Sequence, residues 1–301
     1  MPLDLPAHSA PRPVDAVALA RLQQRLLCAA EPPWLHGEVA RRMAERLSVI
    51  RLQPAQVVDW GSFLGASQAH LAQAYPQARM VAVEQDSSRG RATAAQLRQR
   101  WWKLWKAAVE VVTPDQLAPG QAQLLWSNMS LQGVLDPAET MRAWQQALAV
   151  DGFLMFSTLG PGSLRQLAAL YAREAWPAAH APFVDMHDLG DMLVAAGFAD
   201  PVMDQETITL TWASPQALLD ELRTMGGNVA PHRQTGLRTP RWRDQLLAGL
   251  AGTADAGGRV AMDFEVVYGH AFKPLPRPRV TGRTEVPLAD MQVMVRSSRK
   301  G

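Results

Sequence analysis

The sequence predicts an α/β protein with a doubly wound, mainly parallel sheet that carries helices on both faces. Short β-branched runs recur along the chain, and most are separated by stretches with apolar residues at helical spacing. The clearest unit is 56–85, where QVVDW and RMVAVEQ flank the helical stretch ASQAHLAQAYP. This is the order of a βαβ unit, and its repetition favours parallel strands joined by helical crossovers.

The other elements follow the same two periodicities. Two helices are expected before the first strand, over 14–30 and 32–50, and prolines stand where the second one begins. Further helices are expected over 136–150 and 163–176. The remaining strand candidates are 107–113, 122–128, 152–159, 206–212 and 261–272.

Composition excludes several classes of protein. Hydrophobic residues make up 48% of the 301 positions and charged residues 19%, and no apolar run approaches the roughly 18 residues of a membrane span. The N-terminus lacks a secretory signal pattern. Cys28 is the single cysteine, which excludes an intramolecular disulfide and a cysteine-cluster metal site. We therefore expect a cytoplasmic protein, without a membrane partner, and a net charge of +2 gives no argument for nucleic acid.

The chain divides by composition into three parts. Residues 1–13 hold four prolines and are expected to be a mobile leader. Residues 14–273 carry the periodic pattern and are expected to form one domain with an N-terminal helical cap. Residues 274–301 are rich in proline and arginine and are expected to be a weakly packed tail.

The turn after the first strand, DWGSFLG, is the first candidate site. In doubly wound sheets ligands bind beyond the carboxyl ends of the strands, and Asp59 ends the strand while Gly61 and Gly65 suit a tight turn and a close approach. Glu84 ends the second strand, where a carboxylate can accept hydrogen bonds from ribose hydroxyls. The dinucleotide fingerprint G-x-G-x-x-G is missing, and Phe63 would obstruct a diphosphate. A nucleoside without phosphates is therefore favoured.

Two stretches resemble known families. VVDWGSFLG resembles the first motif of class I S-adenosylmethionine-dependent methyltransferases, with Phe63 in place of the middle glycine. The stretch 122–167 resembles the malonyl-acyl-carrier-protein O-methyltransferases of biotin synthesis more specifically, and 183–228 is similar both to them and to mitochondrial complex I assembly factors. The matched positions are Trp126, Ser127, Asn128, Gln132, Thr158, Leu159, Gly162, Ser163 and Leu164.

This resemblance, over roughly residues 20–272, implies a Rossmann-like class I fold with an antiparallel C-terminal strand and S-adenosylmethionine as cofactor. Carried over by position, it puts one group of residues at the methionine moiety, another at the ribose and adenine, and a third beside the cofactor. These are Asp59, Gly61, Ser62 and Gly65, then Glu84 and Thr113, then Ser127 and Asn128. It also implies methyl esterification of the malonyl carboxylate of acyl carrier protein.

Three departures from the family pattern bear on activity. Phe63 replaces a glycine, Thr113 stands where an aspartate usually meets the adenine, and Gln123 replaces an acid. We expect weakened but real cofactor binding. The alternative is a catalytically weak or inactive protein that acts as an assembly or binding factor. A variant of this alternative is oxidation of a protein arginine, but the sequence shows no group of metal-binding residues that would support it. A nucleic-acid methyltransferase would need an Asn/Asp-Pro-Pro-aromatic motif, which the stretch WSNMSL does not supply.

Methyl transfer to a carboxylate requires few catalytic side chains. A carboxylate is already a nucleophile, so methyl transfer needs alignment, exclusion of water and a cation that holds the acid, but no general base. An arginine is the natural clamp because its planar fork binds carboxylates bidentately. The candidates are Arg41, Arg42, Arg142, Arg165 and Arg223, each of which is individually better explained as a surface ion pair.

Two aromatic features have structural and functional interpretations. Residues 89–106 are basic and rich in tryptophan, which is typical of a surface helix packed on the core, and the alternative is a dock for an acidic acyl carrier protein. Trp60 and Trp126 lie beside cofactor motifs, where an aromatic face can attract a sulfonium cation, but core packing is the favoured role for both.

Overall fold

The computed structural model describes residues 12–26, 28–29, 31–85, 87–100, 109–234 and 236–276. Its centre is one seven-stranded sheet with the order β3-β2-β1-β4-β5-β7-β6. β1 to β5 are mutually parallel, whereas β7 runs antiparallel to both β5 and β6. The strands are β1 Gln56–Trp60, β2 Arg79–Val83, β3 Glu110–Val112, β4 Ala122–Ser127, β5 Leu148–Leu159, β6 Ala199–Trp212 and β7 Val260–Phe272. The predicted doubly wound, mainly parallel class is confirmed.

Strand order reverses between β1 and β4, and this places the site. β1 pairs with β2 on one side and with β4 on the other, so Val58 lies between Val81 and Leu125. The chain leaves β1 toward β2 and β3, then returns to β4 and β5 on the opposite side. The helices that follow these strands diverge, and a crevice forms at the carboxyl ends of β1 and β4.

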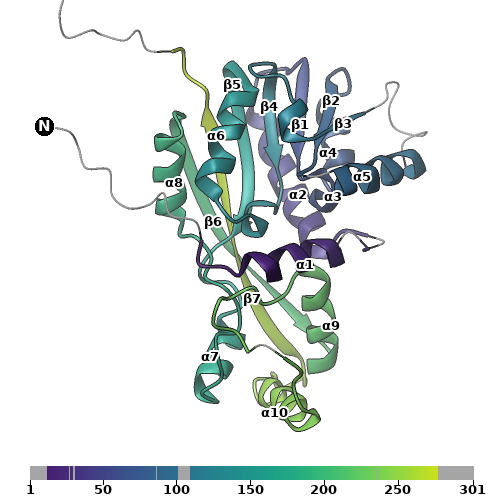
Figure 1. Cartoon of the computed structure of the whole chain (residues 1–301), viewed down its shortest axis with the longest axis vertical. Coiled ribbons are helices and arrows are strands. Elements are labelled where there is room, and N and C mark those ends of the chain that lie inside the picture. Colours follow the sequence, from purple (N-terminus) through teal and green to yellow (C-terminus); the bar gives the residue numbers. More distant parts are fainter. Residues whose placement is uncertain are drawn as a thin grey trace, which may run out of the picture.

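Helices cover both faces of the sheet (Figure 1). One apolar core includes Leu35, Val39 and Met43 of α2, and the other includes Trp144 of α6 and Leu193 of α8. The described helices are α1 Ala16–Leu26, α2 Trp34–Arg46, α3 Ser62–Gly65, α4 Gln68–Ala74, α5 Ser87–Arg100, α6 Pro137–Ala147, α7 Arg165–Arg173, α8 Met186–Ala195, α9 Pro215–Met225 and α10 Pro240–Ala251.

The long antiparallel pair β6 and β7 extends below the rest of the sheet in Figure 1, and α7, α9 and α10 gather around its lower end. The sequence predicted β6 only over 206–212, but the strand begins at Ala199. β6 is an edge strand, and the residues of its first half are exposed or only partly buried, with Asp200, Pro201, Asp204 and Gln205 among them, so this half lacks the apolar signal on which the prediction depends. Tertiary pairing with β7 extends the strand.

The structure describes only parts of the two chain ends and of the basic segment 89–106. Of the predicted leader, only Arg12 and Pro13 are described, and Arg12 is 8% exposed. Residues 277–301 of the predicted tail and 101–108 of the basic segment lie outside the described residues. In the described parts of the chain, every helix is too short or too polar to span a bilayer.

Candidate functional site

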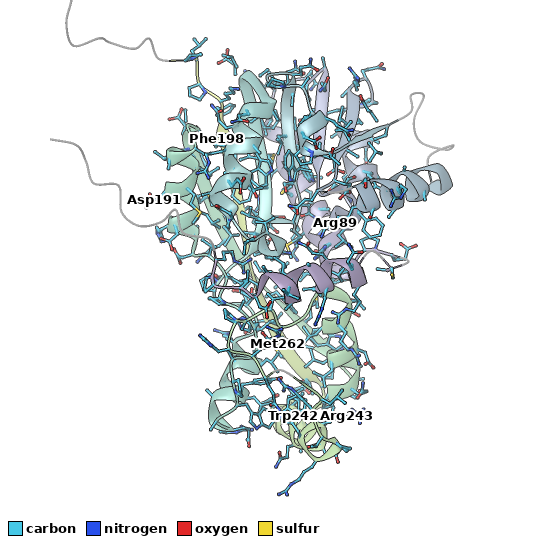
Figure 2. All side chains as sticks on the ribbon, in the orientation of Figure 1. Arg89, Asp191, Phe198, Trp242, Arg243 and Met262 are labelled. Carbon is cyan, nitrogen blue, oxygen red and sulfur yellow. The ribbon has the colours of Figure 1, made fainter. Side chains whose placement is uncertain are left out.

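A cavity of about 480 Å³ lies at the carboxyl ends of β1, β2 and β4 and continues downward between α1, α7, α9 and α10. We call its upper part the polar end; it is lined by Gly61, Glu84, Gln85, Arg89 and Ser130. We call the lower part the apolar end; it is lined by Leu164, Leu167, Leu219, Leu222, Leu246 and Phe264. In Figure 2, Arg89 and Trp242 mark the upper and lower regions.

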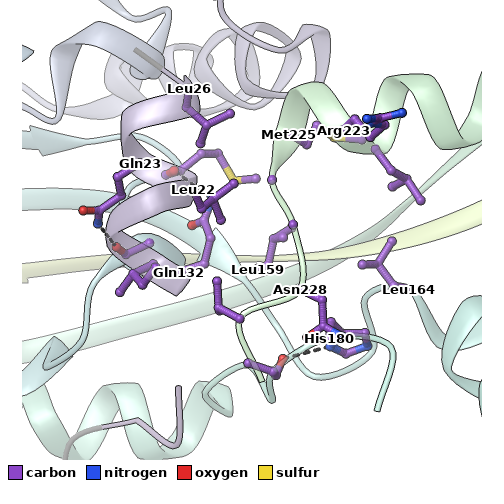
Figure 3. A pocket seen from close by; sticks show the side chains of 18 of the residues that line it. Leu22, Gln23, Leu26, Gln132, Leu159, Leu164, His180, Arg223, Met225 and Asn228 are labelled. Atoms are coloured by element: carbon purple, nitrogen blue, oxygen red, sulfur yellow. Dashed lines mark hydrogen bonds between the residues drawn. The ribbon is translucent and has the colours of Figure 1, made fainter. Parts of the chain in front are cut away.

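Helix α1 covers one side of this cavity. Figure 3 places Leu22 and Leu26 of α1 on one side and Leu164 and Met225 on the other. Gln23 on the same helix donates a hydrogen bond to the Gly133 carbonyl at 2.7 Å, which fixes α1 over the loop that follows β4. The predicted N-terminal helices therefore contribute directly to the cavity wall.

The glycine turn begins at Gly61, which adopts a left-handed conformation with φ of 75°. A Cβ atom at this position would lie 2.8 Å from the Cβ of Ser130, so both the backbone and the space require glycine. Residues Ser62–Gly65 then form the short helix α3, and the Phe63 ring lies in the cavity wall. Phe63 thus lies in a single turn of helix that borders the cavity.

Glu84 stabilises that turn. Its Oε1 atom accepts a hydrogen bond from the Phe63 backbone N–H at 2.5 Å and another from the Thr93 hydroxyl at 2.7 Å. The side chain is buried yet lines the cavity. A carboxylate has about four acceptor positions, so this residue has the capacity to support the turn and also to bind a ligand hydroxyl.

Asp59 lies behind the turn and outside the cavity lining. Its Oδ2 atom accepts a hydrogen bond from the Ser62 hydroxyl at 2.6 Å, and Ser62 accepts one from Gln68 at 2.9 Å. Its Oδ1 atom is buried and has no hydrogen-bond partner. Burial, and to a lesser extent the negative charge of Glu84, raises the pKa of Asp59 to about 7. Asp59 and Ser62 therefore support the turn from beneath.

Asn128 fastens three segments together. Its amide nitrogen donates to the carbonyls of Gly65 at 2.6 Å and His36 at 2.8 Å, and its Oδ1 atom accepts from the Ser157 hydroxyl at 2.7 Å. Ser127 makes a hydroxyl contact of 2.5 Å with Ser130, and Ser130 lines the cavity. Ser127 and Asn128 thus lie beside the polar end and shape it, while Ser130 faces it.

Most of the other sequence candidates lie outside the cavity lining. Thr113 forms a reciprocal cap with Gln116 at the start of a short helical turn. Arg41 pairs with Glu38 and Glu45, Arg42 with Glu38 and Glu206, and Arg165 with Asp263, whereas Arg142 is exposed. Of the arginines considered from sequence, Arg223 does line the cavity.

Sequence reasoning did not select several residues that line the cavity. Four arginines line the cavity, Arg12, Arg89, Arg223 and Arg243, against the two acids Glu84 and Asp220, and of these four only Arg223 was a sequence candidate for the carboxylate clamp. The lining therefore favours an anionic ligand. Arg12 gave no signal because it falls in a proline-rich stretch that reads as a leader.

His36 also lines the polar end. Its Nδ1 atom lies 2.9 Å from the Leu64 carbonyl, and burial lowers the pKa of His36 to about 4, so the ring is neutral at pH 7. Because Nδ1 must carry the proton to donate to that carbonyl, Nε2 is left as an acceptor. The helical spacing after PPWLH predicted the helix that carries His36, but not the burial or the chemistry of this side chain.

Trp60 and Trp126 are both buried in the core, as predicted from the sequence. Trp126 is fully buried, and its indole N–H donates to the Ser67 hydroxyl at 2.7 Å. Trp60 packs edge-on against Trp144 with ring centroids 6.4 Å apart, and it also contributes to the cavity wall. Within the described residues, no group of three or more histidine, cysteine, aspartate or glutamate side chains could hold a metal ion.

Known proteins resemble this chain over the same regions. A family model described as a methyltransferase domain matches residues 34–200. A malonyl-[acyl-carrier protein] O-methyltransferase of Gallionella capsiferriformans is 37% identical over 250 residues, which cover 81% of this chain and 85% of that protein. The chain belongs to the malonyl-[acyl-carrier protein] O-methyltransferase family. A second member, from Laribacter hongkongensis, is 38% identical over 81% of this chain and 84% of its own length.

Solved structures agree with this family at the level of the fold. A putative methyltransferase from Bacillus halodurans superposes with a TM-score of 0.54 at 13% identity, covering 79% of this chain and all of its own. The resemblance inferred from WSNMSLQ and its neighbours is confirmed, as is the methyltransferase class. In this member of the family, the matched methyltransferase domain contains the polar end, whereas α9 and α10 follow it in sequence.

Proposed function

We propose that this methyltransferase uses S-adenosylmethionine to methylate the free carboxylate of malonyl-acyl carrier protein, a step of biotin synthesis, in the cytoplasm. The observation that supports this most strongly is the combination of family membership with a cavity that holds a buried carboxylate at its polar end and four arginines in its lining. The ribose hydroxyls of a cofactor can donate hydrogen bonds to the buried carboxylate, and the arginines can bind an anionic methyl acceptor.

The polar end fits S-adenosylmethionine. Gly61 leaves no side chain at the crevice, Glu84 supplies a carboxylate acceptor for ribose hydroxyls, and His36 Nε2 supplies a neutral acceptor. Phe63 lies where the family pattern has glycine, but a ring in the wall leaves the backbone-lined crevice at Gly61 accessible to a nucleoside. We infer that the ligand packs against Phe63 rather than against a bare loop.

The bound cofactor supplies an electrophilic methyl group on a sulfonium sulfur. The chain itself then has three tasks, which are to align the acceptor carboxylate with the methyl group, to exclude water and to supply a cation that holds the carboxylate. Helix α1 supports exclusion of water because Leu22 and Leu26 close the cavity from one side. The carboxylate attacks without losing a proton, so no general base is assigned.

The apolar end suits the extended thioester arm that carries the acyl group on a carrier protein. Its lining of leucines and Phe264 continues from the polar end to Trp242 and Arg243, giving an elongated site rather than a compact one. A carrier protein delivers its acyl group on an extended thioester arm. The described part of the basic segment, 89–100, begins at the cavity with Arg89, and we propose that the segment 89–106 docks the acidic carrier.

Two measurements test this function. Calorimetric titration with S-adenosylhomocysteine should give micromolar binding, and malonyl-acyl carrier protein should then become a methyl ester in the presence of S-adenosylmethionine, as followed by mass spectrometry. Binding without methyl transfer to this acceptor would refute the assigned substrate.

A second candidate is a binding or assembly factor with a remodelled cofactor site. The observation that favours it is the use of Glu84 as a support for the Phe63 backbone. Absence of detectable binding at millimolar S-adenosylhomocysteine would support this candidate and refute the enzyme proposal.

A further inference from the structure

The arginines of the cavity lining differ in burial. Arg223 and Arg243 are exposed, whereas Arg12 is only 8% exposed. The backbone N–H of Arg12 donates to the Leu135 carbonyl at 3.0 Å, which ties the segment before α1 to the loop that follows β4. The chain thus carries one cation into the interior beside the cavity.

The contacts of Arg12 are all neutral. Nη1 donates to the carbonyls of Gln132 at 2.6 Å and Val134 at 3.4 Å, and Nη2 donates to the Pro182 carbonyl at 2.9 Å. Nε is buried without a hydrogen-bond partner. Among the residues that the structure describes, Arg12 forms no ion pair with an acid, unlike Arg41, which is paired on the surface.

A buried cation without an anion is energetically costly, and carbonyl dipoles offset only part of its desolvation. Burial accordingly lowers the pKa of Arg12. A guanidinium has five N–H donors, and the contacts of Arg12 leave its Nε hydrogen and one Nη2 hydrogen without acceptors. The edge formed by Nε and Nη2 is one of the two on a guanidinium that bind a carboxylate bidentately. An anion is the partner that would best offset the remaining cost of this buried charge.

The position of Arg12 relates it to the polar end. Gln132, whose carbonyl it binds, lines the cavity together with Ser130 of the same loop. Ser130 in turn is the residue that a side chain at Gly61 would strike. Arg12 thus lies along the loop that contacts the glycine turn, at the side of the crevice provided by β4.

We propose that Arg12 binds the free carboxylate of the acyl substrate and so selects a malonyl thioester over neutral acyl thioesters. This inference rests on the proposed function, since it names the residue that would hold the acceptor of that reaction. It replaces Arg41, Arg42, Arg142 and Arg165 in this role, because those four lie outside the cavity lining.

The test measures discrimination rather than activity alone. Malonyl-pantetheine and acetyl-pantetheine, which differ by the carboxylate, are titrated into the full-length protein in the presence of S-adenosylhomocysteine. The wild type should bind the malonyl compound about 100-fold more tightly, the range expected for a charged, largely desolvated hydrogen-bonded pair. Arg12→Gln should bring that ratio close to one, and Arg12→Lys should give an intermediate ratio because lysine keeps the charge but not the planar fork.

Arg142→Gln is the matched control, because Arg142 is exposed on α6 and lies outside the cavity. It should keep the wild-type ratio. A merely structural role for Arg12 would weaken both ligands equally and leave the ratio unchanged, which would overturn the inference. If Arg12→Gln melts below the assay temperature, Arg12→Lys decides, and a wild-type ratio in that variant overturns the inference.

The two proposals fail in different ways. A wild type that prefers the malonyl compound but transfers no methyl group to it refutes the proposed function and leaves the role of Arg12 standing. A wild type that methylates malonyl-acyl carrier protein while Arg12→Gln keeps the full preference refutes only the role of Arg12. A wild type without any preference refutes the role of Arg12 directly.

Discussion

The two ends of the cavity are built in different ways. The polar end is formed by the carboxyl ends of parallel strands, where Gly61, Glu84 and Asn128 are held by hydrogen bonds to backbone groups. The apolar end is formed by side chains of α7, α9 and α10 around two long antiparallel strands, and it is held by packing. The first end tolerates almost no change in geometry, whereas the second accepts changes of shape at a moderate cost.

This contrast implies a division of specificity. Fixed hydrogen-bonding groups reject a ligand that lacks the matching partner, because a buried polar group would be left unpaired. Apolar walls discriminate between ligands more weakly, by their size. We therefore expect cofactor affinity to depend on the polar end and the reach of the acyl arm on the apolar end.

The largest effect should come from Glu84→Ala. This change removes the proposed acceptor of two ribose hydroxyls together with the support of the Phe63 N–H, so affinity for S-adenosylhomocysteine should fall about 1000-fold, corresponding to about 4 kcal/mol. Calorimetry checks this. Glu110→Ala, on the exposed end of β3, is the control and should bind normally. Unchanged affinity in Glu84→Ala would remove Glu84 from the site.

Asp59→Asn should stabilise the protein in a pH-dependent way. Because the pKa of Asp59 is raised to about 7 in the folded state, its contribution to stability is present below pH 4 and is lost as pH rises toward 7. An amide avoids this loss, so the variant should gain roughly 4 kcal/mol over the wild type at pH 8 and little at pH 4. Urea unfolding at the two pH values tests this. A gain that is equal at both pH values would contradict the assignment to this carboxyl group.

Gly61→Ala should destabilise the fold by about 2 kcal/mol, because the new Cβ meets Ser130 and the left-handed backbone is strained. Thermal melting measures the loss. Gly120→Ala has a similar positive φ of 70° but nothing within 4 Å, so it separates backbone strain from the clash. Equal losses in the two variants would show that contact with Ser130 is unimportant.

Leu222→Phe tests the apolar end and should have the smallest effect. Added bulk in this wall should raise KM for malonyl-acyl carrier protein about 10-fold while leaving affinity for S-adenosylhomocysteine unchanged. Steady-state kinetics and calorimetry provide the two readouts. A change in cofactor affinity of the same size would show that the two ends are not independent.

The sequence predicted the scaffold of the site well. Short apolar, β-branched runs located β1, β2 and β4, so the amino-acid pattern alone placed Gly61 and Glu84 at strand ends. The first half of β6 was not predicted because its side chains are exposed or partly buried and carry little apolar signal. Glu84 was expected to face a ligand, and its hydrogen bonds to Phe63 and Thr93 became visible only in three dimensions.

The amino-acid sequence by itself determined the fold class, the glycine turn and the family, because these depend on local periodicity and short motifs. Only the tertiary structure decided which cations reach the cavity. Arg12 binds a carbonyl 120 positions away in the chain, whereas Arg41 is satisfied by Glu38 three positions away on its own helix. Where a long charged side chain ends is set by the packing of distant segments, and no local pattern encodes that destination.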